Sequence, residues 1–204
     1  MPTSLIVVDD FLDDPYVLRD AALRLTYPEV KATYPGRNSE ERINLEGLNN
    51  EVSRLVGEPL VPMIHDQAHG RCRIALASDV GTAKVHVDPS HWTGILYLSQ
   101  PEDCRGGTEF FRHIPTNTER APYGDKEAAE KFGAPSAFQW TSELLDRDTA
   151  DDSKWEMTMR VPMRFNRLVL LRPWLWHTAG ECFGDKLENG RLVYLMFFRS
   201  AKDD

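Results

Sequence analysis

The hydrophobic residues of this chain change their spacing near Gly70, and that change limits the folds open to it. Before Gly70 they recur every three or four residues, and after it they mostly alternate with polar residues. The first pattern indicates amphipathic helices, and the second indicates strands with one buried face. The sequence therefore predicts a mainly β protein with a helical N-terminal part.

Residues 1–69 predict a short strand followed by two supporting helices. The apolar run at 5–8 has strand character. A first helix should begin at Pro15, where an aspartate pair can cap free N–H groups, and should end before Pro28. A second helix is expected over 45–56, with a glycine directly after it. We expect these helices to support the β part of the fold.

Residues 70–204 are filled mostly by short strand candidates separated by turn residues. This pattern is typical of a β-sandwich or barrel backed by helices. One segment, 115–156, is rich in charge and has helical stretches, so we expect an insert that could act as a lid. No linker divides the chain, which predicts one domain over 1–204. The expected strands are 71–77, 83–88, 93–98, 107–112, 167–171, 175–178 and 191–198.

Composition and charge narrow the class of protein. The chain is 41% hydrophobic and 27% charged, as in globular proteins, and no run reaches the ~18 apolar residues of a membrane span. A signal peptide is not expected, so we predict a cytoplasmic protein. The net charge of −8 disfavours nucleic acid and anionic membranes as partners. The three cysteines lack CxxC spacing, which fits free thiols in a reducing compartment.

The first feature with metal-binding chemistry is His86-Val87-Asp88. Residues two apart in a strand project from the same face, so this imidazole and carboxylate would converge. A further histidine would complete the two-His-one-carboxylate set of non-haem iron oxygenases, which leaves coordination positions open. The motif alone is weak evidence, because a hydrogen-bonded His-Asp pair on a strand surface has the same sequence.

Two further residues, both much later in the chain, strengthen the interpretation of this motif as part of a metal site. His177 follows the buried-looking strand 167–171, and Arg191 opens the apolar run 192–198. Burying a lone guanidinium is costly, so Arg191 needs an anionic partner. A dicarboxylate held by the metal at one end would provide one through a bidentate contact. The alternative is an arginine that reaches solvent from the edge of its strand.

The chain resembles the prolyl-hydroxylase-like branch of the iron(II)/2-oxoglutarate-dependent dioxygenase superfamily. The resemblance spans about 83–198. The opening residues also look like a bacterial group of uncharacterised role. The matching segments, in chain order, are His86-x-Asp88, Gly106-Gly107-Thr108-Glu109-Phe110, His177-Thr178-Ala179 and Arg191.

The resemblance implies a fold and a metal centre. The fold is a double-stranded β-helix, or jelly roll, buttressed by helices. The catalytic metal ligands are His86, Asp88 and His177, which would hold iron(II). Because Asp88 fills the position that a halogenase leaves for chloride, halogenation is disfavoured, whereas desaturation and ring closure stay open.

The resemblance also implies a reaction and its co-substrates, 2-oxoglutarate and O2. Arg191 and Tyr97 would hold the distal carboxylate of 2-oxoglutarate, with Thr93 on the same strand face as Tyr97. The reaction would hydroxylate an unactivated C–H bond and release succinate and CO2. Arg199 is a rival to Arg191 as the anchor, because the interval from His177 to Arg191 is longer than the family's usual one.

The substrate is less constrained than the metal. An amino acid, a peptide or another small polar metabolite fits best, and the oligomeric state stays open, a homodimer included. Trp92 and Trp176 could instead be buried residues of the hydrophobic core with no contact to a substrate. The candidate substrate-contacting residues are Arg37, Asn38, Arg73, His91, Trp92 and Trp176.

Three rival functions remain. A cupin-type metalloenzyme would have a similar barrel, but a cupin usually shows two histidines spaced by one residue, and His86-x-Asp88 differs. A non-catalytic binding domain could keep the barrel without turnover. A zinc hydrolase could use the same ligands, although Arg191 would then have no evident purpose.

Overall fold

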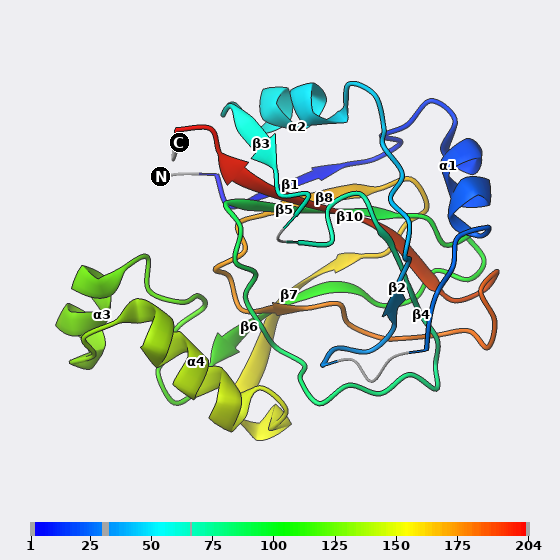
Figure 1. Cartoon of the computed structure of the whole chain (residues 1–204). Coiled ribbons are helices and arrows are strands. Elements are labelled where there is room, and N and C mark those ends of the chain that lie inside the picture. Colours follow the sequence, from blue (N-terminus) through cyan, green and yellow to red (C-terminus); the bar gives the residue numbers. More distant parts are fainter. Residues whose placement is uncertain (1–2, 30–32, 66, 203–204) are drawn as a thin grey trace.

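Two antiparallel β-sheets lie face to face in the computed structural model of the chain (Figure 1). It describes residues 3–29, 33–65 and 67–202. The strands are β1 (Leu5–Val8), β2 (Arg37–Asn38), β3 (Leu60–Pro62), β4 (Cys72–Ala75), β5 (Trp92–Tyr97), β6 (Gly107–His113), β7 (Trp155–Pro162), β8 (Leu168–Leu171), β9 (His177–Thr178) and β10 (Arg191–Ser200). The helices are α1 (Pro15–Ala22), α2 (Leu48–Val56), α3 (Asp125–Phe132) and α4 (Ala137–Asp148), with a short 3-10 helix η1 (Asp152–Lys154).

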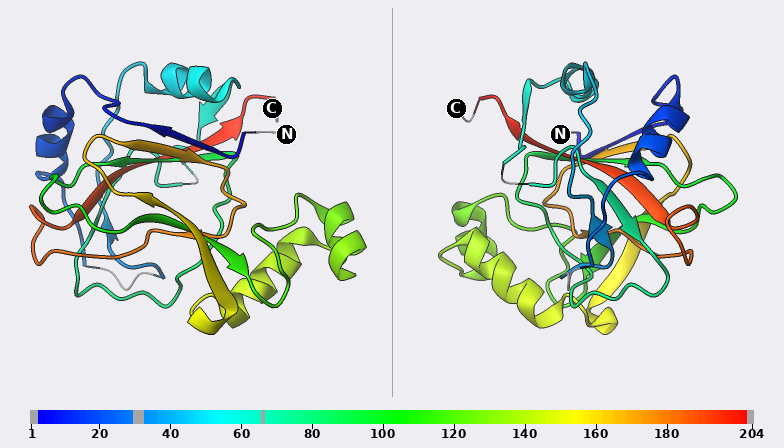
Figure 2. Two further views of the ribbon diagram at one scale, coloured as in Figure 1. Left: turned by 180° about the vertical axis from the view of Figure 1, so that it is seen from behind. Right: turned by 45° about the vertical axis from the view of Figure 1, so that its right-hand side comes forward.

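The larger sheet has the strand order β1-β8-β5-β10-β4-β2, and β3 pairs with the far end of β10. The smaller sheet has the order β7-β6-β9. Helices α1 and α2 cover the outer face of the larger sheet, whereas α3 and α4 stand beside the smaller one (Figures 1 and 2). The mainly β architecture with helical support is therefore confirmed. Within the described residues, no helix has the length and apolar character needed to cross a membrane.

The first two helices begin and end close to the expected places. α1 starts at Pro15, but the side chain of Asp14 makes no capping hydrogen bond, so that part of the prediction is wrong. The helix stops at Ala22, before the expected end, and Leu25 N–H instead bonds to the Ala22 carbonyl in a tighter turn. α2 closes at Gly57, whose φ of 72° is the left-handed conformation that glycine adopts at helix ends.

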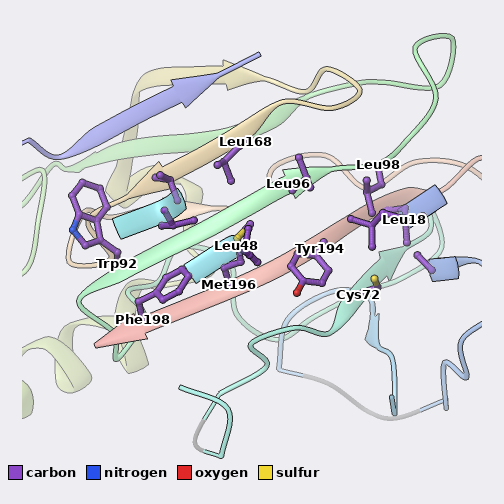
Figure 3. Close-up of a cluster of buried hydrophobic side chains, with 14 of the residues drawn as sticks. Leu18, Leu48, Cys72, Trp92, Leu96, Leu98, Leu168, Tyr194, Met196 and Phe198 are labelled. Carbon is purple, nitrogen blue, oxygen red and sulfur yellow. The ribbon is translucent and has the colours of Figure 1, made fainter. Parts of the chain in front are cut away.

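The main hydrophobic core lies between α1, α2 and the larger sheet (Figure 3). Leu18 of α1 and Leu48 of α2 pack over strand residues such as Leu96 and Tyr194. In β10 the even-numbered residues face this core, and the odd-numbered ones face the space between the sheets. Both faces of β10 are therefore buried, which explains why its sequence is almost continuously apolar.

Segment 115–156 forms α3, α4 and η1, and these elements pack on the end of the smaller sheet. Phe132 of α3 stacks on Trp140 of α4, with ring centres 4.1 Å apart. Leu144 of α4 joins Trp155 and Trp176 in a separate hydrophobic cluster. The segment is thus an ordered helical hairpin with its own small core.

One strand prediction is wrong, and three strands, β2, β3 and β7, were not predicted. Residues 83–88 do not form a strand, because only His86 makes a backbone bridge. The strand β7 was not predicted at all. It is an edge strand with exposed residues over 156–160, so it lacks the apolar alternation by which a half-buried strand is recognised.

Gly107, the first residue of β6, occupies a position that a side chain cannot enter. Its φ is 150°, and a Cβ atom there would overlap the carbonyl oxygen of Val161 on β7. We expect Gly107→Ala to lower the free energy of unfolding by at least ~1–3 kcal/mol, since backbone strain alone costs that much. Urea denaturation measures the effect. Gly124→Ala is the matched control, because Gly124 has extended backbone and open space around it; equal midpoints for both variants would contradict the prediction.

Candidate metal centre

A backbone bridge brings His86 and His177 together. The N–H of His86 donates to the carbonyl of His177 at 2.9 Å, and the N–H of His177 donates back at 3.1 Å. Residues paired in this way present their side chains on the same side, and the two imidazole centres are 4.4 Å apart. Since His177 belongs to β9 of the smaller sheet, the pair lies where segment 83–88 meets that sheet.

Asp88 completes a cluster of three potential metal ligands. Its Oδ2 lies 3.4 Å from Nε2 of His177, and its Oδ1 lies 3.8 Å from Nε2 of His86. All three ligand atoms fall within 4.8 Å of one another. Metal bonds of about 2.1 Å would hold such donors about 3 Å apart at right angles, so a small contraction would suffice to bind an ion.

Hydrogen bonds from neighbouring backbone fix both imidazole rings. Nδ1 of His86 lies 2.9 Å from the carbonyl oxygen of Lys84, and Nδ1 of His177 lies 2.8 Å from that of Leu175. A carbonyl can only accept, so each Nδ1 carries a proton, and in the neutral form of each ring Nε2 keeps its lone pair. Both lone pairs are thus available to a metal ion, as the second shell of a metal site requires.

Thr93 sets the orientation of the carboxylate. Its hydroxyl donates to Oδ2 of Asp88 at 2.8 Å and also contacts the hydroxyl of Ser90 at 2.9 Å. Thr93 is 2% exposed and lines the same cavity as the three ligands. The structure therefore places Thr93 beside the potential metal ligand Asp88.

The electrostatics of the cluster favour an anionic Asp88. Burial and the neighbouring His177 lower the pKa of His86 to about 4. Burial opposes the ionisation of Asp88, but contact with His177 and His86 and the Thr93 hydrogen bond outweigh it and lower its pKa to about 2. Burial alone would lower the pKa of His177, whereas its contact with Asp88 raises it above the usual value of 6.5.

Metal binding at pH 6 should therefore release a proton. The pKa of His177 is raised above 6.5, so at pH 6 most of the metal-free protein holds a proton on Nε2 that a metal must displace. Affinity should then fall about tenfold for each pH unit below that pKa. Calorimetry with Ni²⁺ in two buffers of different ionisation enthalpy measures the released protons. Zero protons released at pH 6 would contradict the prediction.

The ligands open onto a cavity of about 250 Å³ between the two sheets. Residues of β5 and β10 line it in a row, from Thr93 and Ile95 to Val193 and Arg191. Arg191 is 2% exposed, and its Nε and Nη2 atoms have no hydrogen-bond partner in the described part of the chain. Burial lowers the pKa of Arg191. The cavity thus contains a potential metal site and a buried guanidinium without a counter-ion.

Tyr97 lies behind this cavity and does not line it. The side chain is fully buried, and its hydroxyl accepts a hydrogen bond from the N–H of Thr108 and contacts that residue's hydroxyl. The guanidinium carbon of Arg191 is 5.9 Å from the ring centre of Tyr97. Tyr97 is therefore placed to act on Arg191, whereas direct contact with a ligand was expected. Arg199, the rival anchor, lies at the far end of β10 opposite Val61.

Two of the candidate substrate residues line the cavity. Arg73 donates to the carbonyl oxygens of Tyr34 and Pro35 and to the amide oxygen of Asn38. Asn38 and Arg73 both face the metal cavity. Arg37 lies in a neighbouring pocket, 4.0 Å from the carboxylate of Glu29.

Three other candidates lie away from the cavity. His91 contacts Glu58 and Arg172, and Trp92 and Trp176 are fully buried in hydrophobic clusters. The reason is the alternation of strand side chains: a residue next to one that faces the cavity must face away from it. Trp92 adjoins Thr93, and Trp176 adjoins His177.

Sequence reasoning missed several residues around the ligands. The ring of Tyr34 lies 4.4 Å from that of His86, and Lys84, Gln67 and Phe197 also line the cavity. Phe197 could have been found from the odd-numbered spacing that starts at Arg191. The others lie in irregular segments, where no periodicity shows which way a side chain points.

Comparison with known proteins places the chain in a family. Residues 2–198 match a family described as "Family of unknown function (DUF6445)". The chain belongs to this family. Because the match covers nearly the whole chain, it includes both sheets and all three potential metal ligands, but the description assigns no activity.

Among solved structures, the DUF6445 chain resembles the proteins HygX and SnoK in fold. HygX from Streptomyces hygroscopicus, crystallised with nickel, 2-oxoglutarate and hygromycin B, has a TM-score of 0.52 at 14% identity over 98% of this chain and 84% of HygX. SnoK, a non-heme alpha-ketoglutarate-dependent carbocyclase from nogalamycin biosynthesis, has a TM-score of 0.54 at 14% identity over 98% and 87%. At these identities the likeness establishes the fold alone.

A curated relative by sequence is Ribonuclease PH of Synechococcus sp. (strain CC9605). It is 27% identical over 139 residues, which are 68% of this chain and 52% of that protein. The chain thus spans about half the length of this relative. The match is partial, and no activity is transferred from it.

Proposed function

We propose that this DUF6445 chain is an iron(II)- and 2-oxoglutarate-dependent dioxygenase of the prolyl-hydroxylase-like branch, built on a jelly roll. The observation that carries the proposal is the shared cavity. It contains two histidines and a carboxylate that can bind a metal, together with the buried Arg191, whose Nε and Nη2 lack partners. Neither feature is expected from folding stability alone, because an unpaired buried guanidinium is costly.

The side chains that line the cavity suit both iron(II) and 2-oxoglutarate. Iron(II) suits two imidazoles and one carboxylate, so His86, Asp88 and His177 would hold it. A dicarboxylate that reaches Arg191 would satisfy the two unpartnered atoms through a charge-assisted fork. The row of apolar residues between these points, Ile95 and Val193, suits a methylene chain.

The protein's own part in the reaction is positioning. Thr93 would hold the carboxylate of Asp88 toward the metal, and Tyr97 would support Arg191 from behind. When bound, iron(II) and 2-oxoglutarate would supply the oxidising chemistry with O2, and succinate and CO2 would leave. We propose hydroxylation of an unactivated C–H bond in an amino acid, peptide or small polar metabolite, in the cytoplasm.

The two structural neighbours support the cofactors without fixing the reaction. One was crystallised with nickel and 2-oxoglutarate, and the other is named as alpha-ketoglutarate-dependent. Since SnoK is a carbocyclase, ring closure stays open beside hydroxylation and desaturation. The unpartnered Arg191 weighs against a cupin-type enzyme, a zinc hydrolase and a simple binding domain, none of which needs a dicarboxylate anchor.

Turnover without added substrate tests this proposal. Wild-type protein with Fe(II), 2-oxoglutarate and O2 should form succinate slowly, and Asp88→Ala should form none above the level of free iron. Chromatographic detection of succinate is the measurement. A wild-type rate no higher than that of the variant would contradict the proposed function.

A further inference from the structure

The metal cavity has two ends that differ chemically. Thr93, whose hydroxyl holds the carboxylate of Asp88, pairs with Phe197 across β5 and β10. The potential metal ligands therefore lie toward the Phe197 end of β10. Arg191 marks the other end, where a dicarboxylate would be bound. The residues of β10 that line the cavity between these ends are Val193 and Leu195.

The chain after β3 runs beside β10 at the metal end. The N–H of Met63 donates to the carbonyl of Phe197 at 2.9 Å. The N–H of Gly70 donates to the carbonyl of Leu195 at 2.8 Å. Gln67 lies between these two contacts in the sequence, and its side chain lines the metal cavity. The side-chain amide of Gln67 is therefore presented at the metal end.

Tyr34 lies next to one of the potential ligands. Its ring centre is 4.4 Å from that of His86, and 37% of the residue is exposed. Its backbone is held by Arg73, whose Nη2 donates to the carbonyls of Tyr34 at 2.8 Å and Pro35 at 2.6 Å. A phenol ring held in this way brings its hydroxyl to the metal end of the cavity.

The charged side chains that line the cavity already have roles or partners, apart from Arg191. Asp88 belongs to the cluster of potential metal ligands. Nζ of Lys84 lies 2.9 Å from both oxygens of Asp152. Arg73 directs its guanidinium at the loop that carries Tyr34. If a dicarboxylate takes Arg191, the described residues leave no charge in this cavity for a primary substrate.

The polar atoms that stay available are uncharged. Within the described residues, neither the hydroxyl of Tyr34 nor the side-chain amide of Gln67 makes a hydrogen bond. Asn38 uses only Oδ1, which accepts from Arg73 at 2.7 Å, so its Nδ2 is available as well. Such groups can hydrogen-bond a hydroxyl or an amide. A charged group would lose hydration here without meeting an opposite charge, which is costly.

We propose that the part of the primary substrate that enters the metal cavity is uncharged and carries a hydroxyl or amide group, and that Tyr34 and Gln67 bind it. Leu195 and Phe197 would contact its hydrocarbon part. The proposal rests on the proposed function, because it assigns Arg191 to 2-oxoglutarate. It deepens that function by naming the chemical class of the group presented to the metal.

Paramagnetic broadening by Mn²⁺ tests this proposal, because it reports which molecules come close to the bound ion. The protein is saturated with 2-oxoglutarate, supplied with less than one Mn²⁺ per chain in place of iron, and mixed with each probe for NMR. The probes share a five-carbon chain: pentanamide is uncharged, pentylamine is a cation and pentanoate is an anion. The protons of pentanamide should broaden at least about tenfold more than those of either charged probe, since an unpaired charge is penalised at least that strongly.

A charge introduced at Gln67 should change this preference. Gln67→Glu places a negative charge where the amide lies, so pentylamine should broaden more than pentanamide. Gln139→Glu is the matched control, because Gln139 is exposed on α4 and does not line the cavity; its preference should equal that of wild type. The protons of 2-oxoglutarate should broaden equally in both variants, which reports an intact metal site.

Removal of one hydroxyl tests the other contact. Tyr34→Phe keeps the ring beside His86 and should reduce the broadening of pentanamide about three- to tenfold, as the loss of one neutral hydrogen bond allows. Tyr16→Phe is the control, because Tyr16 is 51% exposed on α1 and does not line the cavity. It should behave as wild type.

The outcomes separate this proposal from the proposed function. If the protons of 2-oxoglutarate do not broaden in wild-type protein, the proposed function is rejected and this assignment with it. If they broaden while the three probes broaden equally, or not at all, the substrate class alone is overturned. A preference for pentanamide that Gln67→Glu and Tyr34→Phe both leave unchanged would overturn the assignment of these two residues.

Discussion

Asp88→Ala should lose metal binding by at least ~100-fold. The variant removes the only anionic ligand of the cluster and leaves two neutral imidazoles, and even second-shell changes cost ~10–100-fold in metal affinity. Removing Asp88 also removes the contact that raises the pKa of His177, so that pKa should fall below its wild-type value. Ni²⁺ calorimetry measures the first effect, and an NMR titration of the His177 ring in metal-free protein measures the second.

A matched control for this variant is Asp20→Ala. Asp20 is an exposed aspartate of α1, far from the cavity lining, and alanine suits a helix. Metal affinity and the His177 titration should both match wild type. Retention of metal binding in Asp88→Ala would show that another carboxylate completes the site, and an unchanged His177 pKa would refute the contact with Asp88.

Arg191→Met should weaken 2-oxoglutarate binding and stabilise the ligand-free protein. Removing one partner of a buried charge pair costs ~2–5 kcal/mol, which is roughly 30- to several-thousand-fold in Kd. Within the described residues, Nε and Nη2 of this buried guanidinium have no hydrogen-bond partner, and replacing buried charge with a well-packed apolar residue can gain ~1–4 kcal/mol. Calorimetry with 2-oxoglutarate and urea denaturation without it measure the two effects.

Arg191→Met is expected to lower the affinity for 2-oxoglutarate but to raise the stability of the ligand-free protein, and these opposite changes make the prediction specific. A residue that only supports the fold would lose stability when replaced, and affinity would fall because the cavity is disordered. Arg24→Met is the control, because Arg24 is exposed and both quantities should stay within error. If Arg191→Met had lower stability and unchanged 2-oxoglutarate affinity, a residue other than Arg191 would have to bind the distal carboxylate.

The cluster of His86, Asp88 and His177 could be anticipated from residue types and their order, but its geometry could not. The reasoning for His86 and Asp88 used a strand that does not exist. They converge because His86 bridges to His177 and because Thr93 turns the carboxylate of Asp88. Backbone pairing between residues about ninety positions apart leaves no trace in a local pattern.

The errors among the substrate candidates have a physical origin in strand alternation. Thr93 and Trp92 cannot both face one cavity from the same strand, and neither can His177 and Trp176. Applying that rule to each pair would have removed both tryptophans. Tyr34, by contrast, lies in an irregular segment, and its contact with the ring of His86 depends on tertiary packing that a sequence pattern does not encode.

One measurement tests the central claim most directly. Anaerobic addition of Fe(II) and then 2-oxoglutarate to the wild-type protein should give a weak visible charge-transfer band, since the co-substrate would chelate the metal through its keto and carboxylate oxygens. The band should be absent in His177→Ala, and in Arg191→Met it should require much more 2-oxoglutarate. No band in wild-type protein that has bound one iron per chain would contradict the assignment of this cavity to iron(II) and 2-oxoglutarate.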